Sequence, residues 1–219
     1  MNEFLTNLPI FFQAIWETLY IVLISMVVSG ILGLAIGVGL TTTRRGGVLA
    51  NRGVYAILNI VVNIVRPVPF VIFIAAVGPL TLAVVHTTIG NNAVIFALSL
   101  AAAFAVARIV EQNLITVDPG VIEAARAVGA GPWRIILTVL LPEGLGPLVL
   151  GYTFIFVGIV DMSAQAALIG GGGLGNFAIT YGYQRYNWPA VYITVAVIIV
   201  IVQAGQYFGN SLARRALRR

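Results

Sequence analysis

Five long apolar runs, separated by shorter polar stretches, set the pattern of the chain. The clearest extends from Thr18 to Leu40 and contains no charged side chain. Because a transmembrane helix needs about 20 mostly apolar residues, this run predicts a membrane-spanning helix. Four further runs that are mostly apolar are Val54 to Val77, Ala93 to Val110, Leu148 to Ile169 and Ala190 to Phe208. The pattern therefore predicts an all-α, polytopic membrane protein with five transmembrane helices.

Composition supports this class and excludes others. Of the 219 residues, 60% are hydrophobic and only 9% are charged, which is outside the usual range for a soluble domain. The spans leave little chain for a separate soluble domain, so we expect a single membrane domain. The absence of cysteine excludes disulfides, thiolate catalysis and cysteine-ligated metal, and we expect no metal site or cofactor on this chain.

Arginines are distributed unevenly between the two sides of the predicted membrane domain. Loops retained in the cytoplasm accumulate positive charge. Arg185 is the one arginine of the opposite side, and Arg66 and Arg108 fall within spans. We therefore expect the N-terminus outside and the C-terminus in the cytoplasm, and no nucleic-acid binding. The arginines assigned to the cytoplasmic side are Arg44, Arg45, Arg52, Arg126, Arg134, Arg214, Arg215, Arg218 and Arg219.

The segment between the third and fourth spans predicts two short helices. Asp118 can cap the first, and Pro119 suits its first position. Gly129 can end it in the left-handed conformation, and Pro132 can open a second helix that runs to Pro142. By spacing alone, the segment could equally be an ordinary interfacial loop.

The residues of this segment also resemble those of a known protein family. Glu123-Ala124-Ala125, Gly129 six positions after the glutamate, and Leu141-Pro142 resemble the EAA loop of ATP-binding-cassette importer permeases. The resemblance implies that Glu123 to Val128 docks as a coupling helix into a groove of a separate ATPase subunit. Ala124 and Ala125 would then allow close approach and Glu123 would offer a charged contact, while Gly129 permits the turn. Glu123 and Arg126 are three residues apart, so they could also meet on the exposed face of the helix.

Four other sequence segments extend the resemblance over residues 15–210 and narrow it to the methionine-uptake branch of these importers. They are NIVRPVPF (63–70), TTIG (87–90), ARIVEQNL (107–114) and GGGGLGNFAITYGYQRYN (170–187). The resemblance implies the type I permease fold over 15–210, with a cytoplasmic coupling loop at 116–144. Residues 211–219 would form a basic cytoplasmic tail.

The same resemblance implies a function and a set of partners. The chain would be a non-catalytic permease subunit in a bacterial cell membrane, importing methionine in its L form, its D form or both. Its partners would be a second copy of itself, two ATPase subunits that bind ATP with magnesium, and an extracytoplasmic substrate-binding protein. Alternatives are a permease for another amino acid or small polar solute, a secondary transporter and a membrane scaffold.

The glycine run Gly170 to Gly175 could suggest a phosphate-binding loop. Such a loop requires a Gly-Lys-Ser/Thr end, and this chain contains no lysine. ATP hydrolysis is therefore expected on a partner subunit. We favour an outer gate or a contact with the binding protein over a flexible connection.

Arg66 lies near the middle of the second span, roughly 12 positions and about 18 Å along a helix. Pro67 and Pro69 follow it and favour a broken helix that lines a cavity. Arg66 could border the path of a zwitterionic substrate. It could instead be tied to Glu111, Asp161 or free carbonyl groups.

Asp161 is an acid within the fourth span, with Met162 and Gln165 close by in sequence. An ionisable residue inside the membrane is a functional candidate by default. Asp161 could select a cationic or more polar substrate, or it could be the counter-ion of Arg66. Two other features have simpler interpretations: Arg108 and Glu111 as a pair within one helix, and Gly33 with Gly37 as a helix-packing surface within the chain.

Overall fold

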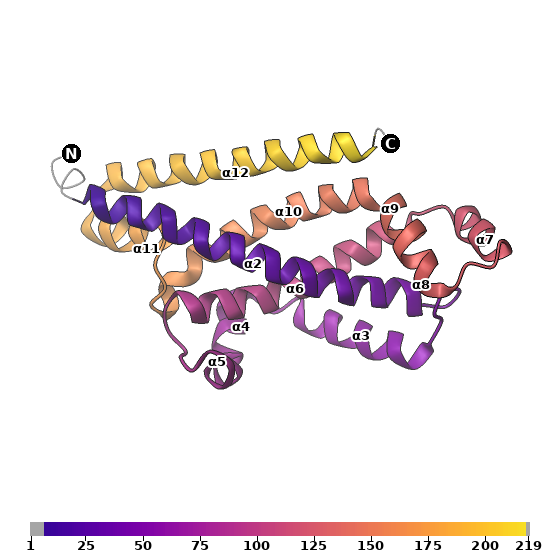
Figure 1. Cartoon of the computed structure of the whole chain (residues 1–219). Coiled ribbons are helices and arrows are strands. Elements are labelled where there is room, and N and C mark those ends of the chain that lie inside the picture. Colours follow the sequence, from indigo (N-terminus) through magenta and orange to yellow (C-terminus); the bar gives the residue numbers. More distant parts are fainter. Residues whose placement is uncertain (1–6, 218–219) are drawn as a thin grey trace. The chain divides into compact units, whose positions relative to one another are not determined.

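The computed structural model describes residues 7–217, and within this range the chain is helical and contains no strand (Figure 1). Short π-helical and 3₁₀ segments link some of the helices. Arg218 and Arg219 of the predicted tail lie outside the described residues, and the preceding residues continue the last helix. The α-helices are α2 (Leu8–Thr43), α3 (Arg52–Val65), α4 (Phe70–Ala76), α5 (Gly78–Val85), α6 (Asn91–Ile115), α7 (Pro119–Ala127), α8 (Pro132–Ile135), α9 (Leu141–Glu143), α10 (Leu145–Ala164), α11 (Leu174–Phe177) and α12 (Trp188–Leu217).

Four segments are long and apolar enough to cross a membrane: α2, α6, Leu145–Ile169 and α12. The bent pair α3 and α4 makes a fifth span if it is counted as one. Four of the five predicted spans are therefore present as long helices and the second as this bent pair, although the helices extend beyond the apolar runs. For example, α2 begins at Leu8 rather than Thr18, because the polar residues Gln13 and Glu17 that precede the apolar run are good helix formers and continue the helix.

The second span is broken where the prolines predict. Helix α3 ends at Val65, the Arg66 N–H donates to the Val62 carbonyl at 3.1 Å, and α4 begins only at Phe70. Proline has no N–H to donate, so Pro67 and Pro69 cannot continue the ladder of helical hydrogen bonds. The additional helix α5 follows α4 directly, beyond the predicted end of the run at Val77, and was not predicted from the sequence.

The chain forms two compact units, and each of the four long helices contributes to both. The first unit comprises the chain up to Val28, Val68–Ala102 and Phe156–Gln206. Its core contains Phe11 and Phe177, whose ring centroids are 5.0 Å apart. Because Phe11 comes from α2 and Phe177 from α11, this contact fixes the segment after the glycine run against the first helix.

The second unit comprises Ser29–Pro67, Ala103–Ile155 and the chain from Tyr207 onward. Here α2 packs closely on α6 through its glycines. A Cβ atom at Gly37 would lie 2.6 Å from the Ala107 carbonyl oxygen and would also collide with Val110. A Cβ at Gly33 would collide with Val106 in the same way. The predicted packing role of Gly33 and Gly37 within the chain is therefore confirmed.

A polar network joins α6 to α3 in this second unit. Arg108 forms the predicted salt bridge with the buried Glu111, one turn along α6. Its other terminal nitrogen donates to Asn59 Oδ1 at 3.0 Å and to Asn63 Oδ1 at 2.6 Å. Paired and hydrogen-bonded charges are tolerated in an apolar environment, so this network fixes α3 just before the break at Arg66.

Candidate functional site

Helix α7 forms over the predicted coupling segment, with the predicted signals at both ends. The Asp118 carboxylate accepts a hydrogen bond from the Gly120 N–H at 2.8 Å, and Pro119 is the first helical residue. The helix ends at Ala127, and Gly129 adopts the left-handed conformation with φ of 79°. The Ala130 N–H then donates to the Ala125 carbonyl at 3.0 Å, as in a helix C-cap.

One face of α7 is turned toward the rest of the second unit. Ile122, Glu123 and Arg126 line a small cavity of about 120 Å³, together with the turn that follows α2. Across this cavity, Arg126 Nη2 donates to the Gly47 carbonyl at 3.3 Å. The expectation that Arg126 meets Glu123 is not met, since residues 7–217 show no salt bridge between them. Arg126 reaches a backbone acceptor on another segment instead.

The opposite face of α7 is open. Val121 and Ala124 are exposed, and Val128 just beyond the helix is 85% exposed. Ala125 is half-buried at the border between the two faces. The structure thus separates the predicted coupling residues into two groups: Ala124 lies on the open face, whereas Glu123 and Arg126 lie beside the cavity.

The second helix of the loop begins at Pro132, as predicted, but its course is not a plain α-helix. Ile136–Leu140 form a π-helical turn, in which the Leu141 N–H bonds to the Ile136 carbonyl. Pro142 has no N–H for the α-helical ladder, and it follows this turn directly. The helical course continues through α9 to Glu143, one residue past the predicted end.

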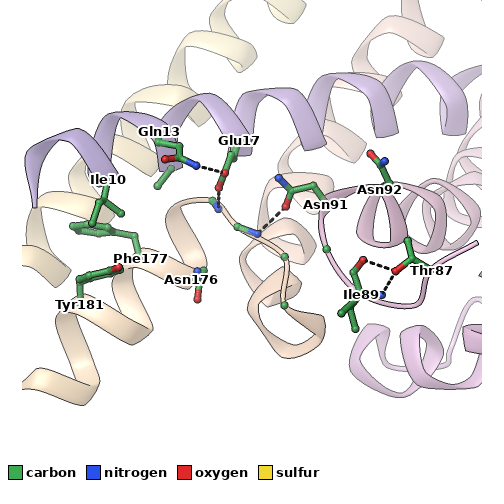
Figure 2. Close-up of a pocket in the computed structure, with 16 residues that line it drawn as sticks. Ile10, Gln13, Glu17, Thr87, Ile89, Asn91, Asn92, Asn176, Phe177 and Tyr181 are labelled. Carbon is green, nitrogen blue, oxygen red and sulfur yellow. Dashed lines mark hydrogen bonds between the residues drawn. The ribbon is translucent and has the colours of Figure 1, made fainter. Parts of the chain in front are cut away.

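The glycine run is held in place by side chains from two distant helices in the first unit (Figure 2). The Gly172 N–H donates to Asn91 Oδ1 at 2.7 Å and the Gly173 N–H to Glu17 Oε2 at 2.9 Å. The next N–H, of Leu174, donates to Thr18 Oγ1 at 2.8 Å. Three successive backbone donors are therefore satisfied, which disfavours a merely flexible connection.

Two of these glycines are required by geometry. A Cβ atom at Gly172 would overlap the Glu17 carboxylate, and Gly173 has φ of 95°, which side chains rarely adopt. Glu17 and Asn91 were not identified from the sequence as partners of the loop. Both residues are far from the loop along the chain. The only signal in the sequence is that Glu17 is an acid directly before the first apolar run.

A cavity of about 680 Å³ lies beside this loop, within the first unit (Figure 2). Its one acidic side chain among the described lining residues is the half-buried Glu17. The Arg185 guanidinium carbon lies 4.7 Å from the centroid of the Tyr181 ring, which forms part of the wall. Other polar groups of the lining come from Gln13, Thr87, Asn91, Asn92 and Asn176.

The residues predicted for a substrate path are divided between the two units: Arg66 and Pro67 belong to the second unit, and Pro69, Asp161, Met162 and Gln165 belong to the first. Arg66, Pro67, Pro69 and Asp161 are exposed on this chain. Glu111 is bonded to Arg108, which removes it as the partner of Arg66. Asp161 and Gln165 are four residues apart at the end of the fourth span, where the Gln165 Oε1 atom is buried without a hydrogen-bond partner among residues 7–217. Met162 is half-buried beside them in sequence.

Comparison with known proteins identifies the type of protein that carries these features. Residues 33–218 match the family described as the binding-protein-dependent transport system inner membrane component. The chain belongs to this family of transporter permeases. The permease is 42% identical to the probable D-methionine transport system permease protein MetI of Vibrio cholerae, over 99% of its own length and 96% of that protein.

Two further comparisons agree. The permease is 39% identical to the methionine import system permease protein MetP of Bacillus subtilis, over 77% of its own length and 76% of the other chain. Among solved structures, a chain of the MetNI methionine ABC transporter in inward-facing conformations has a TM-score of 0.93 and 36% identity. That match covers 96% of this chain and 98% of the other, which confirms the predicted all-α type I importer permease fold.

Proposed function

We propose that the permease is the membrane-spanning subunit of an ATP-driven importer for methionine. The observation that carries this proposal is the similarity to methionine permeases over nearly the whole chain, at 42% identity for the Vibrio cholerae protein. The permease itself hydrolyses nothing. ATP and magnesium are bound by a partner ATPase, two copies of which join two copies of the permease and an external binding protein.

In this mechanism, α7 transmits movement from the ATPase to the spans. Its open face, centred on Ala124, enters a groove of the ATPase, and the face that carries Arg126 contacts the turn after α2. Closing of the ATPase pair upon ATP binding then moves α7 together with that turn. The arginine distribution supports a cytoplasmic position for this loop, with the N-terminus outside and the C-terminus inside.

The import function is tested by uptake of labelled methionine in cells that lack their own methionine importer. The cells express the permease with its partner ATPase and binding protein, and a matched set carries an ATPase that cannot hydrolyse ATP. Uptake should require the active ATPase. Uptake that persists with the inactive ATPase would instead support a secondary transporter, and a stable complex without methionine uptake would direct attention to another amino acid or small polar solute.

Arg66 gives a separate prediction about the path of the substrate through the permease. It is exposed beside a proline-broken helix, and Glu111 is already bonded to Arg108. If Arg66 borders the path, Arg66→Gln should lower methionine uptake about tenfold, the loss expected from one charge-assisted hydrogen bond, without reducing the amount of assembled complex. Uptake and the yield of purified complex are measured on the same membranes. A fall in yield that matches the fall in uptake would assign Arg66 a structural role.

Asp161 motivates the second candidate substrate class. It is an exposed acid within the fourth span, near Met162 in sequence and four residues before Gln165, whose Oε1 atom has no hydrogen-bond partner among residues 7–217. A carboxylate and an amide at this place would suit a polar or cationic solute better than an apolar one. Competition of labelled methionine uptake by unlabelled cationic and polar amino acids tests this alternative directly.

A further inference from the structure

The cavity beside the glycine run contains a carboxylate, that of Glu17, which has no cationic partner among residues 7–217. Glu17 Oε1 accepts from the Gln13 side-chain amide at 2.8 Å, and Oε2 accepts from the Gly173 N–H at 2.9 Å. Both donors are neutral. Among residues 7–217, the salt bridge of Arg108 does not involve Glu17, and no other ion pair reaches it. Because an ionised carboxylate has about four acceptor sites, Glu17 retains the capacity to accept further donors from the cavity.

The cavity has the size of a small-molecule site and a largely polar lining. Its volume of about 680 Å³ lies within the range of ligand pockets, roughly 300–1,000 Å³. Asn91 and Asn92 are the first two residues of α6, and Asn176 lies on the opposite side of the glycine run (Figure 2). The side-chain Oδ1 atom of Asn91 accepts the hydrogen bond from the Gly172 N–H, which leaves the side-chain NH₂ group of Asn91 available as a donor.

Charges of both signs are present near this cavity. Glu17 supplies the negative charge from α2, and Arg185 supplies a positive charge against the Tyr181 ring of the wall. A solute that carries an ammonium group and a carboxylate on one carbon could satisfy the acid through charge-assisted N–H···O bonds, and the amides could donate to its carboxylate. A half-buried acid that faces only neutral donors favours such a cation over a neutral or anionic solute.

We propose that this cavity is an entry site for the transported amino acid, in which Glu17 binds the ammonium group. The inference rests on the importer function proposed above and adds a binding site and a chemical class of ligand. Since Glu17 also accepts from the Gly173 N–H, an ammonium group bound to the same carboxylate shares this acceptor with the glycine run. Solute binding and the position of the glycine run are thereby linked.

The absence of native cysteine allows a direct test. Ile89 lines the cavity and is 66% exposed, so Ile89→Cys introduces the single thiol of the chain at the cavity wall. Gln184→Cys provides a matched thiol, exposed in the same unit but outside the lining. The permease–ATPase complex is placed in vesicles of phosphatidylglycerol and phosphatidylcholine, which contain no primary ammonium group, and the rate of maleimide labelling is measured.

Methionine at about 10 mM should slow labelling of Ile89→Cys about tenfold, given an affinity on the order of 1 mM for a few polar contacts. Labelling of Gln184→Cys should not change. The analogue of methionine that lacks the amino group should give no protection, and Glu17→Gln should abolish protection by methionine. The analogue result uses the native Glu17 and therefore does not depend on the folding of the Glu17 variant.

Other outcomes would overturn the inference. Equal protection by methionine and its deaminated analogue would show that no ammonium group is recognised. Protection by the binding protein alone, without methionine, would show that a protein side chain fills the cavity. Unprotected thiols in a complex that still transports methionine would overturn the entry site but leave the importer function intact, whereas loss of ATPase-dependent uptake in the native complex would overturn the importer function itself.

Discussion

Substitution of Ala124 by tryptophan should abolish copurification of the ATPase subunit with the permease. Ala124 lies on the open face of α7, and none of the residues of this helix is buried in the permease itself. A large side chain therefore costs the permease little, but it prevents close approach to a groove that accepts small residues. We expect ATPase recovery to fall by at least about a hundredfold, as for a clash at the centre of an interface. The ratio of the two subunits after purification through the permease measures this loss.

Two matched variants show whether the face of α7 or only its sequence matters. Ala124→Ser keeps the side chain small and should retain the ATPase. Glu123 lines the cavity together with the turn at Gly47, so Glu123→Gln should also retain most of the ATPase. The docking assignment would be wrong if Glu123→Gln released the ATPase while Ala124→Trp kept it. The amount of permease in the membrane serves as the control for insertion.

Substitution of Gly37 by leucine should strongly destabilise the second unit. A Cβ atom at this position already meets the Ala107 carbonyl and Val110, and the backbone of α6 cannot move aside as a side chain could. Overpacking of this kind costs about 3 kcal/mol, and close helix contacts in membranes depend on small residues. The thermal midpoint of the purified complex should fall by several degrees or more.

The control for this variant lies two residues earlier on the same helix. Ala35 is exposed, so Ala35→Leu adds the same apolar bulk without a collision inside the chain. Its thermal midpoint should remain close to that of the native complex. Equal midpoints for Gly37→Leu and the native protein would contradict the close packing of α2 on α6, and equal loss in both variants would indicate that bulk anywhere on this helix is harmful.

The sequence was sufficient for those features that depend on neighbouring residues. Apolar runs located the spans, because length and hydropathy alone decide whether a helix can cross a membrane. Asp118, Pro119 and Gly129 located α7 for a similar reason: a cap, a first-position proline and a left-handed glycine all act within one turn. The break after Arg66 followed from the chemistry of the two prolines.

Features that depend on contacts between distant segments could not be predicted from the sequence. Arg126 and Glu123 have suitable spacing for a pair, yet the Gly47 carbonyl competes successfully for Arg126. The residues that fasten the glycine run lie more than seventy positions from it, and their sequence separations of 81 and 156 carry no periodic signal. The π-helical turn at Ile136–Leu140 was also missed, because its residues are apolar at all positions except Thr138 and therefore show no break in periodicity.

The glycine run has a consequence for how mutations in it would combine. Although its letters are identical, each glycine meets a different constraint: Gly171 faces Val94 and Ala166, Gly172 faces Glu17, and Gly173 is held by its own backbone angle. A compensating change that makes room at one position therefore does nothing for the next. In genetic terms, each substitution in the run needs its own second-site suppressor. A shorter acid at position 17 could rescue an alanine at position 172 but not one at position 173.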